Sequence, residues 1–183
     1  MKPLLRFEGV TCRRGGRLLF ENMDLSLGPG DALHLIGPNG CGKSSLLRLA
    51  AGLLRAEQGK IERGELALAD EGLALDRELP LRRALQFWAD EVDEAMEALD
   101  LARLAHVPVR LLSTGQAKRA TLARVVGSGA PLWLLDEPLN GLDGDGVKRL
   151  DALVAAHLER GGAVLAASHG PLGGNWTHLE LAA

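Results

Sequence analysis

The segment GPNGCGKS, residues 37–44, constrains the fold of this chain more than any other feature. It matches the phosphate-binding pattern G-x-x-x-x-G-K-[ST] without a gap. The apolar run 32–36 precedes it, and in residues 44–54, which follow it, leucine and alanine recur at helical spacing. A strand, a loop and a helix in this order place free backbone N–H groups of the helix at the loop, whereas an ordinary glycine-rich turn requires neither neighbour. The sequence therefore predicts an α/β domain with a nucleotide site at this loop.

The residues of the loop have separate expected roles. Its glycines let backbone N–H groups curl around phosphates, Lys43 supplies positive charge to the terminal phosphates, and the Ser44 hydroxyl is a magnesium ligand. Cys41 is interpreted as a small residue that the loop tolerates. The nucleotide-binding residues predicted here are Gly37, Pro38, Asn39, Gly40, Cys41, Gly42, Lys43, Ser44 and Ser45.

Two further apolar runs end in polar residues that suit phosphate chemistry. LWLLDEP, residues 132–138, delivers Asp136 as a second magnesium ligand and Glu137 as the carboxylate that orients or polarises an attacking water. His169 lies just beyond the run 163–168, where it could contact a terminal phosphate or the water. The carboxyl ends of parallel strands share one crevice, so these residues are expected beside the loop. Lys43, Glu137 and His169 are the predicted catalytic residues. Histidines 34, 106, 157 and 178 have no such placement and are expected to be structural or solvated.

The pattern along the chain predicts one domain, residues 1–183, with a mainly parallel sheet covered on both faces. Residues 77–127 differ, because they are helical and charged with few strand signals, and we interpret them as a helical insertion. Within the insertion, one helix should carry the stripe Leu81, Ala84, Leu85, Trp88 and Ala89, and a second should run near 91–103. Strands are expected at 4–10, 17–27, 32–36, 131–135, 163–168 and 177–181, and further helices at 44–54 and 144–160.

Composition excludes some classes of function. The net charge of −3 gives no basic field of the kind that attracts nucleic acid. The two cysteines, Cys12 and Cys41, form neither a metal-ligand pair nor a disulfide framework, which favours a reducing, cytosolic compartment. We find no signal-peptide pattern and no apolar run near the ~20 residues that span a bilayer. If the protein works at a membrane, another molecule must hold it there.

A second possible anion site lies far along the chain from the first. In LSTGQ, residues 112–116, a small polar cluster starts a helix-patterned stretch, and the start of a helix offers free N–H groups to an anion. A lone phosphate-binding loop does not explain this second site.

Taken together, GPNGCGKS, LSTGQ, LLDEP, NGLD and SH resemble, in order and distance, the nucleotide-binding domain of ABC transporters. The resemblance covers nearly the whole chain. It implies a P-loop NTPase fold of the ABC ATPase type, with N-terminal antiparallel strands beside the mainly parallel sheet, and it implies ATP and Mg²⁺ as ligands. In this family two domains pair head to tail, and the LSTGQ segment of one grips the ATP held by the other.

Roles follow from this resemblance position by position. Ser113, Gly115 and Gln116 match the segment that contacts the γ-phosphate across the dimer. Asp143, in NGLD, matches the residue that links the two active sites, and His169 matches the switch histidine.

The chain departs from the family pattern at three places. Thr114 replaces the usual glycine. No aromatic residue is present to stack on adenine, and Arg14 falls at about that place, where its guanidinium plane could stack instead. The glutamine of the switch loop is missing, with Asp70 or Glu71 nearest to its position.

Within the superfamily, LLRLAAGLL, LQFWA and SGAPLWLLDEPLNGLD look like the ATPase subunits of cytochrome c maturation, the haem exporters. This resemblance implies a peripheral protein at the cytoplasmic face of the bacterial inner membrane that works with separate integral-membrane subunits. Its ATP hydrolysis would be coupled to haem export or to the release of a haem chaperone. The sequence has no C-x-x-C-H, and no direct haem site is expected. Phe87 lies off the stripe that holds Trp88, so it either faces a docking helix or is an aromatic residue at the core edge. Lys118, Arg119 and Arg124 are interpreted as a solvated helix face.

Three other functions stay open. The motifs do not specify the cargo, so an ABC ATPase with a different cargo is the first alternative. A soluble ABC protein acting on DNA or ribosomes is disfavoured, because 183 residues leave no room for two cassettes and the charge is acidic. A P-loop phosphotransferase would leave LSTGQ unexplained.

Overall fold

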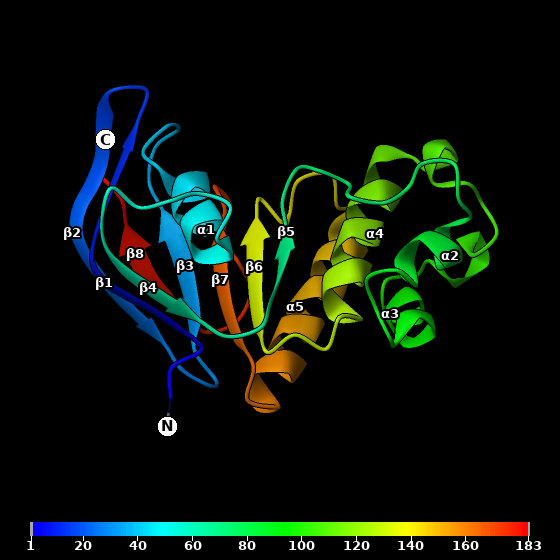
Figure 1. Cartoon of the computed structure of the whole chain (residues 1–183). Helices are drawn as coiled ribbons and strands as arrows, with labels where there is room; N and C mark the ends of the chain where they lie inside the picture. The colour runs from blue at the N-terminus through cyan, green and yellow to red at the C-terminus, as the bar shows by residue number, and fades with distance from the viewer. Residues whose placement is uncertain (1, 183) are drawn as a thin grey trace.

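Two sheets form the β part of the computed structural model, which describes residues 2–182 (Figure 1). One sheet has five parallel strands in the order β5-β6-β7-β3-β8, and the other has three antiparallel strands in the order β2-β1-β4. The parallel strands are β3 (Ala32–Ile36), β5 (Leu66–Ala69), β6 (Leu132–Asp136), β7 (Ala163–Ala167) and β8 (Thr177–Glu180). The antiparallel strands are β1 (Leu5–Arg14), β2 (Arg17–Leu27) and β4 (Gln58–Arg63). The predicted fold class is confirmed.

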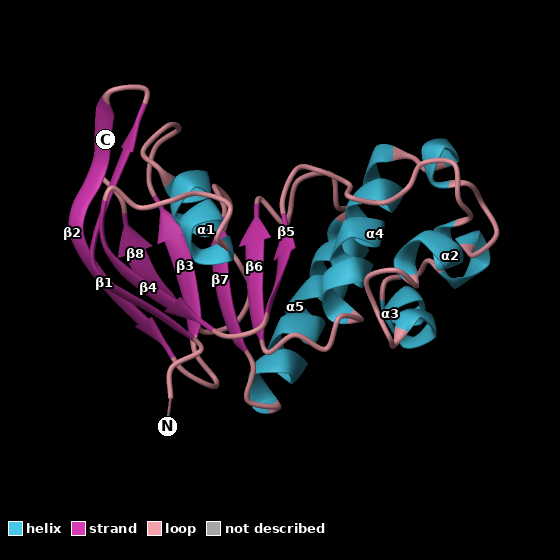
Figure 2. Cartoon of the chain, viewed as in Figure 1, coloured by secondary structure: helices cyan, strands magenta, loops and turns pink. Residues whose placement is uncertain are grey.

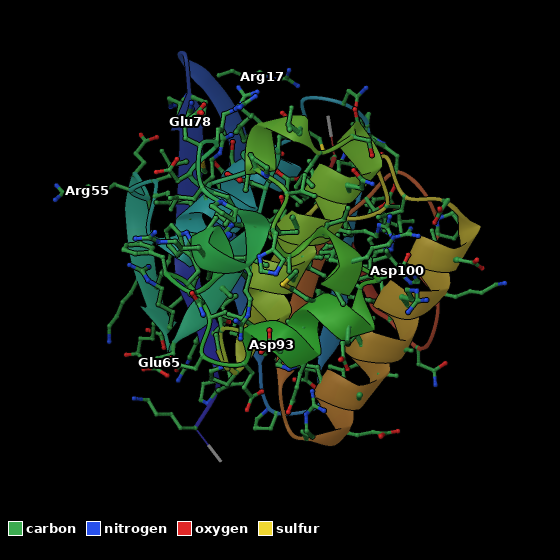
Figure 3. The ribbon with its side chains drawn as sticks, turned by 90° about the vertical axis from the view of Figure 1, so that its right-hand side faces the viewer. Arg17, Arg55, Glu65, Glu78, Asp93 and Asp100 are labelled. Atoms are coloured by element: carbon green, nitrogen blue, oxygen red, sulfur yellow. The ribbon has the colours of Figure 1, made fainter. Side chains whose placement is uncertain are left out.

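The helices divide into those that cover the parallel sheet and those beyond its β5 edge (Figure 2). The first group holds α1 (Lys43–Ala51) and α5 (Gly144–Glu159). The second holds α2 (Leu81–Leu85), α3 (Val92–Ala98) and α4 (Thr114–Val126), with 3₁₀ turns at Ala102–Leu104 and Val109–Leu111. Figure 3 looks onto this helical end, where Asp93 on α3 pairs with Arg82 of α2 through two hydrogen bonds of 2.6 and 2.8 Å.

Strand alternation divides the interior into two apolar cores. In β6, Leu132 and Leu134 pack with α1 and the antiparallel sheet, whereas Trp133 and Leu135 pack with α5 and the helical end. This follows from the twofold side-chain period of a strand, which sends neighbouring residues to opposite faces. A strand buried on both faces has to be apolar throughout, and all five residues of β7 are buried alanine, valine or leucine.

Several element boundaries differ from the sequence expectation. The strand 32–36 is confirmed, but the first strand, expected at 4–10, runs on to Arg14 as β1 and leaves only Gly15–Gly16 as the turn before β2. Strand β4 was not predicted, because its polar sequence QGKIER lacks the apolar pattern of a strand. It is held in the sheet by main-chain pairing with β1. The helix expected near 91–103 ends at Ala98.

The expectation that one helix carries the whole stripe is wrong for Trp88 and Ala89, which lie beyond the end of the helix. Helix α2 ends at Leu85, and Trp88 is 43% exposed. The Arg124 guanidinium lies 5.0 Å from the centre of its ring, so a cation–π contact replaces core packing.

The expectation of a solvated basic face on α4 is also wrong. Lys118, Arg119 and Arg124 are partly buried, and each donates a hydrogen bond to a carbonyl oxygen of a neighbouring segment. Lys118 Nζ lies 3.4 Å from Asp136 O, and Arg124 Nη2 lies 2.6 Å from Leu68 O. The side chains of α4 therefore tie the helical end to the parallel sheet. Across residues 2–182, every helix is too short or too polar to traverse a bilayer.

Candidate nucleotide-binding site

A cavity of about 490 Å³ lies at the carboxyl end of the parallel sheet, beside the loop 37–44. Many of the residues predicted from the sequence line it: Arg14, Asn39, Gly40, Gly42, Lys43, Ser44, Ser45, Glu137 and His169. Their segments follow or precede different strands, so the parallel topology is what gathers them.

The loop delivers a helix start and a buried amine to this cavity. Gly42 caps α1 with φ at 113°, a left-handed conformation that a residue with a Cβ rarely adopts. The first N–H groups of α1 then point at the cavity without intrahelical partners. The Lys43 amine donates to Gly37 O at 2.7 Å and to Pro38 O at 3.1 Å. The loop therefore presents both donors and a positive charge to an anion.

Oxygen donors gather next to the start of α1. Burial raises the pKa of Asp136, a hydrogen bond from the Ser44 hydroxyl opposes that shift, and the charges of Glu137 and Glu71 add to it. A cation at this point would compensate the clustered carboxylates. A hydroxyl and one or two carboxylates suit Mg²⁺, which otherwise relies on water and phosphate oxygens. Within residues 2–182 there is no group of three or more His, Cys, Asp or Glu side chains that could hold a metal ion. A Mg²⁺ ion at this site would therefore have few protein ligands.

Glu137 and His169 lie next to each other in the cavity wall. His169 Nε2 lies 3.5 Å from Glu137 Oε1, and the His169 backbone N–H donates to Glu137 Oε2 at 3.4 Å. Glu137 has φ at 46°, which is rare for a residue with a side chain, and its N–H donates to Ala167 O at 2.8 Å. Strained backbone held by the surrounding structure is a frequent feature of functional sites.

The LSTGQ segment lies outside this cavity, at the start of α4. Ser113 caps the helix: its Oγ accepts from the Gln116 N–H at 3.3 Å, and the Gln116 side chain accepts from the Ser113 N–H at 2.9 Å. This capping box occupies two donors and leaves the N–H groups of Thr114 and Gly115 at the positive end of the helix dipole.

Gly115 lies where a side chain would not fit. A Cβ there would be 2.9 Å from Gly141 O, so the start of α4 packs against the NGLD turn. In that turn, Asp143 caps α5 by accepting from the Gly146 N–H at 2.8 Å. The turn also reaches the cavity, because Asn140 lines it. The second predicted anion site and the cavity are thus linked through one turn.

The structure separates some of the predicted residues from the cavity wall and adds others. Gly37, Pro38, Cys41 and Asp136 are not among the residues that line the cavity, and Ser113, Gly115, Gln116 and Asp143 lie at the start of α4 and in the NGLD turn. Leu19 and Asn140 line the cavity although they were not predicted as site residues, and Glu71, which was considered only for the switch-loop position, lines it too. Of the two candidates for the switch-loop position, Glu71 faces the cavity, whereas the Asp70 carboxylate accepts from the Gly72 N–H at 3.0 Å.

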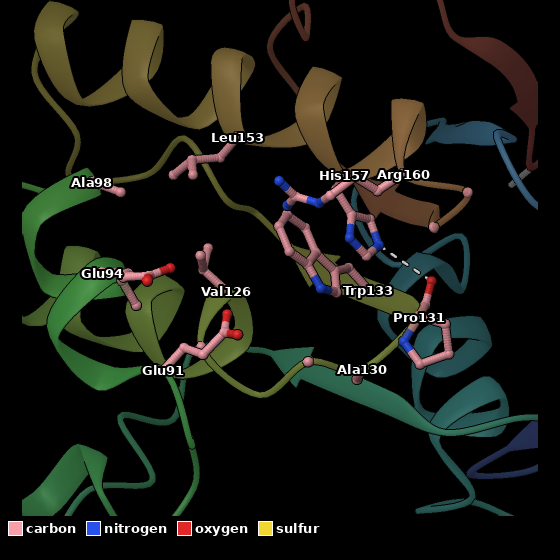
Figure 4. A pocket seen from close by; sticks show the side chains of 15 residues that line it. Glu91, Glu94, Ala98, Val126, Ala130, Pro131, Trp133, Leu153, His157 and Arg160 are labelled. Atoms are coloured by element: carbon pink, nitrogen blue, oxygen red, sulfur yellow. Dashed lines mark hydrogen bonds between the residues drawn. The ribbon is translucent and has the colours of Figure 1, made fainter.

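A second cavity, of about 500 Å³, lies at the opposite end of the sheet (Figure 4). Trp133 and His157 stack in its wall with ring centroids 3.8 Å apart, and His157 Nε2 lies 3.2 Å from Pro131 O. Glu91 and Glu94 border it from the helical end. Because it adjoins the amino ends of β6 and β7, it is separate from the candidate nucleotide site.

Comparisons with known proteins agree with this arrangement. The model of the ABC transporter family matches residues 20–140. The cytochrome c biogenesis ATP-binding export protein CcmA of Sphingopyxis alaskensis is 57% identical over 177 residues, covering 92% of this chain and 91% of that protein. The protein of the same name from Novosphingobium aromaticivorans is 58% identical over 167 residues, covering 89% and 87%. The chain therefore belongs to the ABC transporter family and, within it, to the cytochrome c biogenesis ATP-binding export proteins.

Solved structures share the fold. An ATP-binding subunit of an ABC transporter has a TM-score of 0.84 at 21% identity, covering 91% of this chain and 79% of that one. A dimeric ATP-binding cassette in a post-hydrolysis state, bound to ADP and Pi, has a TM-score of 0.80 at 20% identity, covering 91% and 88%. At these identities the likeness is one of fold.

Proposed function

We propose that this chain is the ATPase of a cytochrome c biogenesis complex, and that it couples ATP hydrolysis to haem export or to release of a haem chaperone through membrane partners. The family membership and the relatives' names support the ATPase and the cytochrome c biogenesis parts of this function. The observation that carries the mechanism is the single cavity that brings Lys43, Glu137 and His169 together while LSTGQ lies outside it.

The loop 37–44 and the start of α1 bind the triphosphate, with Lys43 moving from the loop carbonyls to the terminal phosphates. Arg14 lies at the cavity wall, where its guanidinium plane can stack on the adenine ring. Ser44 and Asp136 would hold Mg²⁺, which when bound would supply positive charge to offset the charge that develops on the phosphates. Glu137 orients and polarises the attacking water, and His169 donates to the γ-phosphate or to that water.

A second copy of the chain completes the site. In this arrangement Ser113, Gly115 and Gln116 of one copy contact the γ-phosphate bound by the other, and Asp143 links the two sites. The exposed position of the α4 start, outside its own chain's cavity, supports this head-to-tail pairing. We propose that residues 1–183 act as one nucleotide-binding domain, with residues 77–127 as its helical part.

The integral-membrane subunits dock where the helical end meets the sheet. A cavity of about 270 Å³ there is bordered by Leu53, Leu68 and Trp88. Phe87 next to it is 81% exposed, which is unusual for a large apolar side chain. Docking at this surface would hold the protein at the cytoplasmic face of the bacterial inner membrane as a peripheral subunit, with the haem handled by its partners.

The test combines nucleotide binding with purification of the intact complex. Lys43→Ala should abolish productive ATP binding, and the exposed control Lys148→Ala should not change it. Membrane fractions should yield the chain together with integral-membrane subunits that act in cytochrome c maturation. Co-purification with subunits of a different transporter would contradict the proposed role in cytochrome c biogenesis but not the proposed ATPase activity. Recovery with nucleic acid would overturn the whole proposal.

A further inference from the structure

His34 is a buried polar residue that lies next to the nucleotide site without lining its cavity. It is on β3, three residues before the loop 37–44 begins, and only 4% of it is exposed. Its Nε2 lies 3.0 Å from the carbonyl oxygen of Ser168. Because a carbonyl can only accept, Nε2 must carry the proton and donate. Ser168 is the residue immediately before His169.

The Ser168 carbonyl needs this donor. Strand β7 ends at Ala167, so Ser168 lies one residue past the strand, and it is only 3% exposed. A buried carbonyl without a partner is costly and rare. The Ser168 hydroxyl in turn accepts from the Gly170 N–H at 3.2 Å, which closes the turn around His169.

The segment that follows His169 folds back over the same imidazole. Trp176 meets the His34 ring edge-on, with centroids 6.1 Å apart and planes at 67°. The Trp176 indole is itself held, because Nε1 donates to Gly173 O at 2.8 Å, and the Gly173 N–H donates to Asp151 on α5 at 3.3 Å. His178, the register partner of His34 on β8, packs against the ring at 5.4 Å. His34 therefore contacts the chain on both sides of His169.

We propose that His34 is a positioning residue for His169: it fixes the turn that aims the His169 side chain at Glu137 and at the bound nucleotide. This inference rests on the proposed role of His169. His34 touches neither the cavity nor the loop amine, so its loss should lower kcat through a displaced His169 and leave the KM for ATP nearly unchanged. Small displacements of groups around a reacting centre can cost about 10²-fold in rate.

The test begins with His34→Phe, which keeps an aromatic ring and removes the donor, and with His34→Gln, which keeps a side-chain N–H. We expect kcat to fall about 10- to 100-fold in His34→Phe with KM unchanged within about twofold, and a partial recovery in His34→Gln. If His34→Phe does not fold, His34→Met, a flexible apolar side chain, replaces it. An unchanged kcat in the folded variant, or equal changes in kcat and KM, would overturn the inference.

A double-mutant cycle with His169→Ala separates this inference from the proposed function. If His34 acts through His169, its replacement should have no further effect on kcat in the His169→Ala background. An equal loss in both backgrounds would show a purely structural role and overturn the inference. An unchanged kcat in His169→Ala alone would instead overturn the proposed role of His169 and, with it, this inference.

Discussion

His169 meets the Glu137 carboxylate at both of its oxygens, through the imidazole Nε2 at 3.5 Å from Oε1 and through the backbone N–H at 3.4 Å from Oε2. The two residues come from turns after neighbouring parallel strands, β6 and β7. The structure thereby couples the carboxylate that would polarise water to the histidine that would contact phosphate. A substitution at either residue should therefore alter the position of the other side chain.

Glu137→Gln should separate binding from hydrolysis. The amide keeps the shape of the side chain but cannot act as a base, so we expect kcat to fall by about 10²- to 10⁴-fold while ATP affinity is retained. Steady-state ATPase rates and nucleotide titration measure the two effects. Glu159→Gln, an exposed carboxylate at the far end of α5, is the matched control and should change neither. Normal turnover in Glu137→Gln would show that its role is assigned wrongly.

Glu71→Gln should weaken metal binding. Glu71 lines the same cavity as Ser44, and its negative charge contributes to the raised pKa of Asp136. Removing this charge therefore lowers the negative potential at the proposed metal position. We expect the Mg²⁺ concentration for half-maximal activity, and the Mn²⁺ dissociation constant measured by spin resonance with ATP, to rise about 3- to 10-fold. Asp70→Asn removes the same charge one residue earlier and should leave both values unchanged. Equal effects of the two changes would contradict a specific role of Glu71 at the metal position, because either negative charge would then act equally on the site.

The sequence predicted which segments meet at the carboxyl end of the parallel sheet, because the signals of those segments are local. A loop such as residues 37–44 needs only its own glycines and the adjoining strand and helix, and Asp136 and Glu137 follow directly from an apolar strand. The choice between Asp70 and Glu71 could not be made in this way. The two carboxylates are adjacent and chemically alike, and a hydrogen bond to Gly72 decides which one turns away from the cavity.

Features that depend on distant partners were missed. Trp88 fits a buried helical stripe until Arg124, 36 residues later, supplies a cation at its ring. Arg119 and Lys118 look like solvated residues until the carbonyls of Leu99 and Asp136 accept from them. His34 carries no sequence signal, because its partner at Ser168 is 134 residues away. In each case tertiary contacts override the local pattern.

Phe87→Ala should weaken membrane association and leave ATPase activity intact, because the side chain is exposed beside the proposed docking cavity and distant from the lining of the nucleotide cavity. Fractionation of cells that carry the whole complex, with ATPase assays of the purified chain, gives both readouts. Leu18→Ala, an exposed apolar residue on β2, serves as the control. Loss of both properties, or of neither, would contradict the docking role.

The folded protein should lose stability as the pH falls through the histidine range. Burial lowers the pKa of His157, and its hydrogen bond to Pro131 O only partly opposes this. Below its ordinary pKa of about 6.5, the unfolded chain therefore binds more protons than the folded chain, and the free energy of unfolding decreases. Between pH 8 and pH 5.5, His157→Phe should lose less stability than the parent protein, by on the order of 1 kcal/mol.

Urea unfolding at the two pH values measures this difference. At pH 8 the variant should itself be about 1–2 kcal/mol less stable, because Pro131 O loses its donor. The same pH dependence in both proteins would contradict the assignment of a neutral, buried His157.

The central claim is that ATP is held between the loop 37–44 of one copy and the start of α4 of another. Its most direct test is the ATP-dependent mass, in analytical ultracentrifugation, of Glu137→Gln with and without Ser113→Arg. We expect Glu137→Gln to form a dimer with ATP and Mg²⁺, and the double variant to bind ATP equally tightly but remain a monomer, because the arginine side chain blocks the α4 start. An ATP-dependent dimer that persists unchanged with Ser113→Arg would contradict the claim.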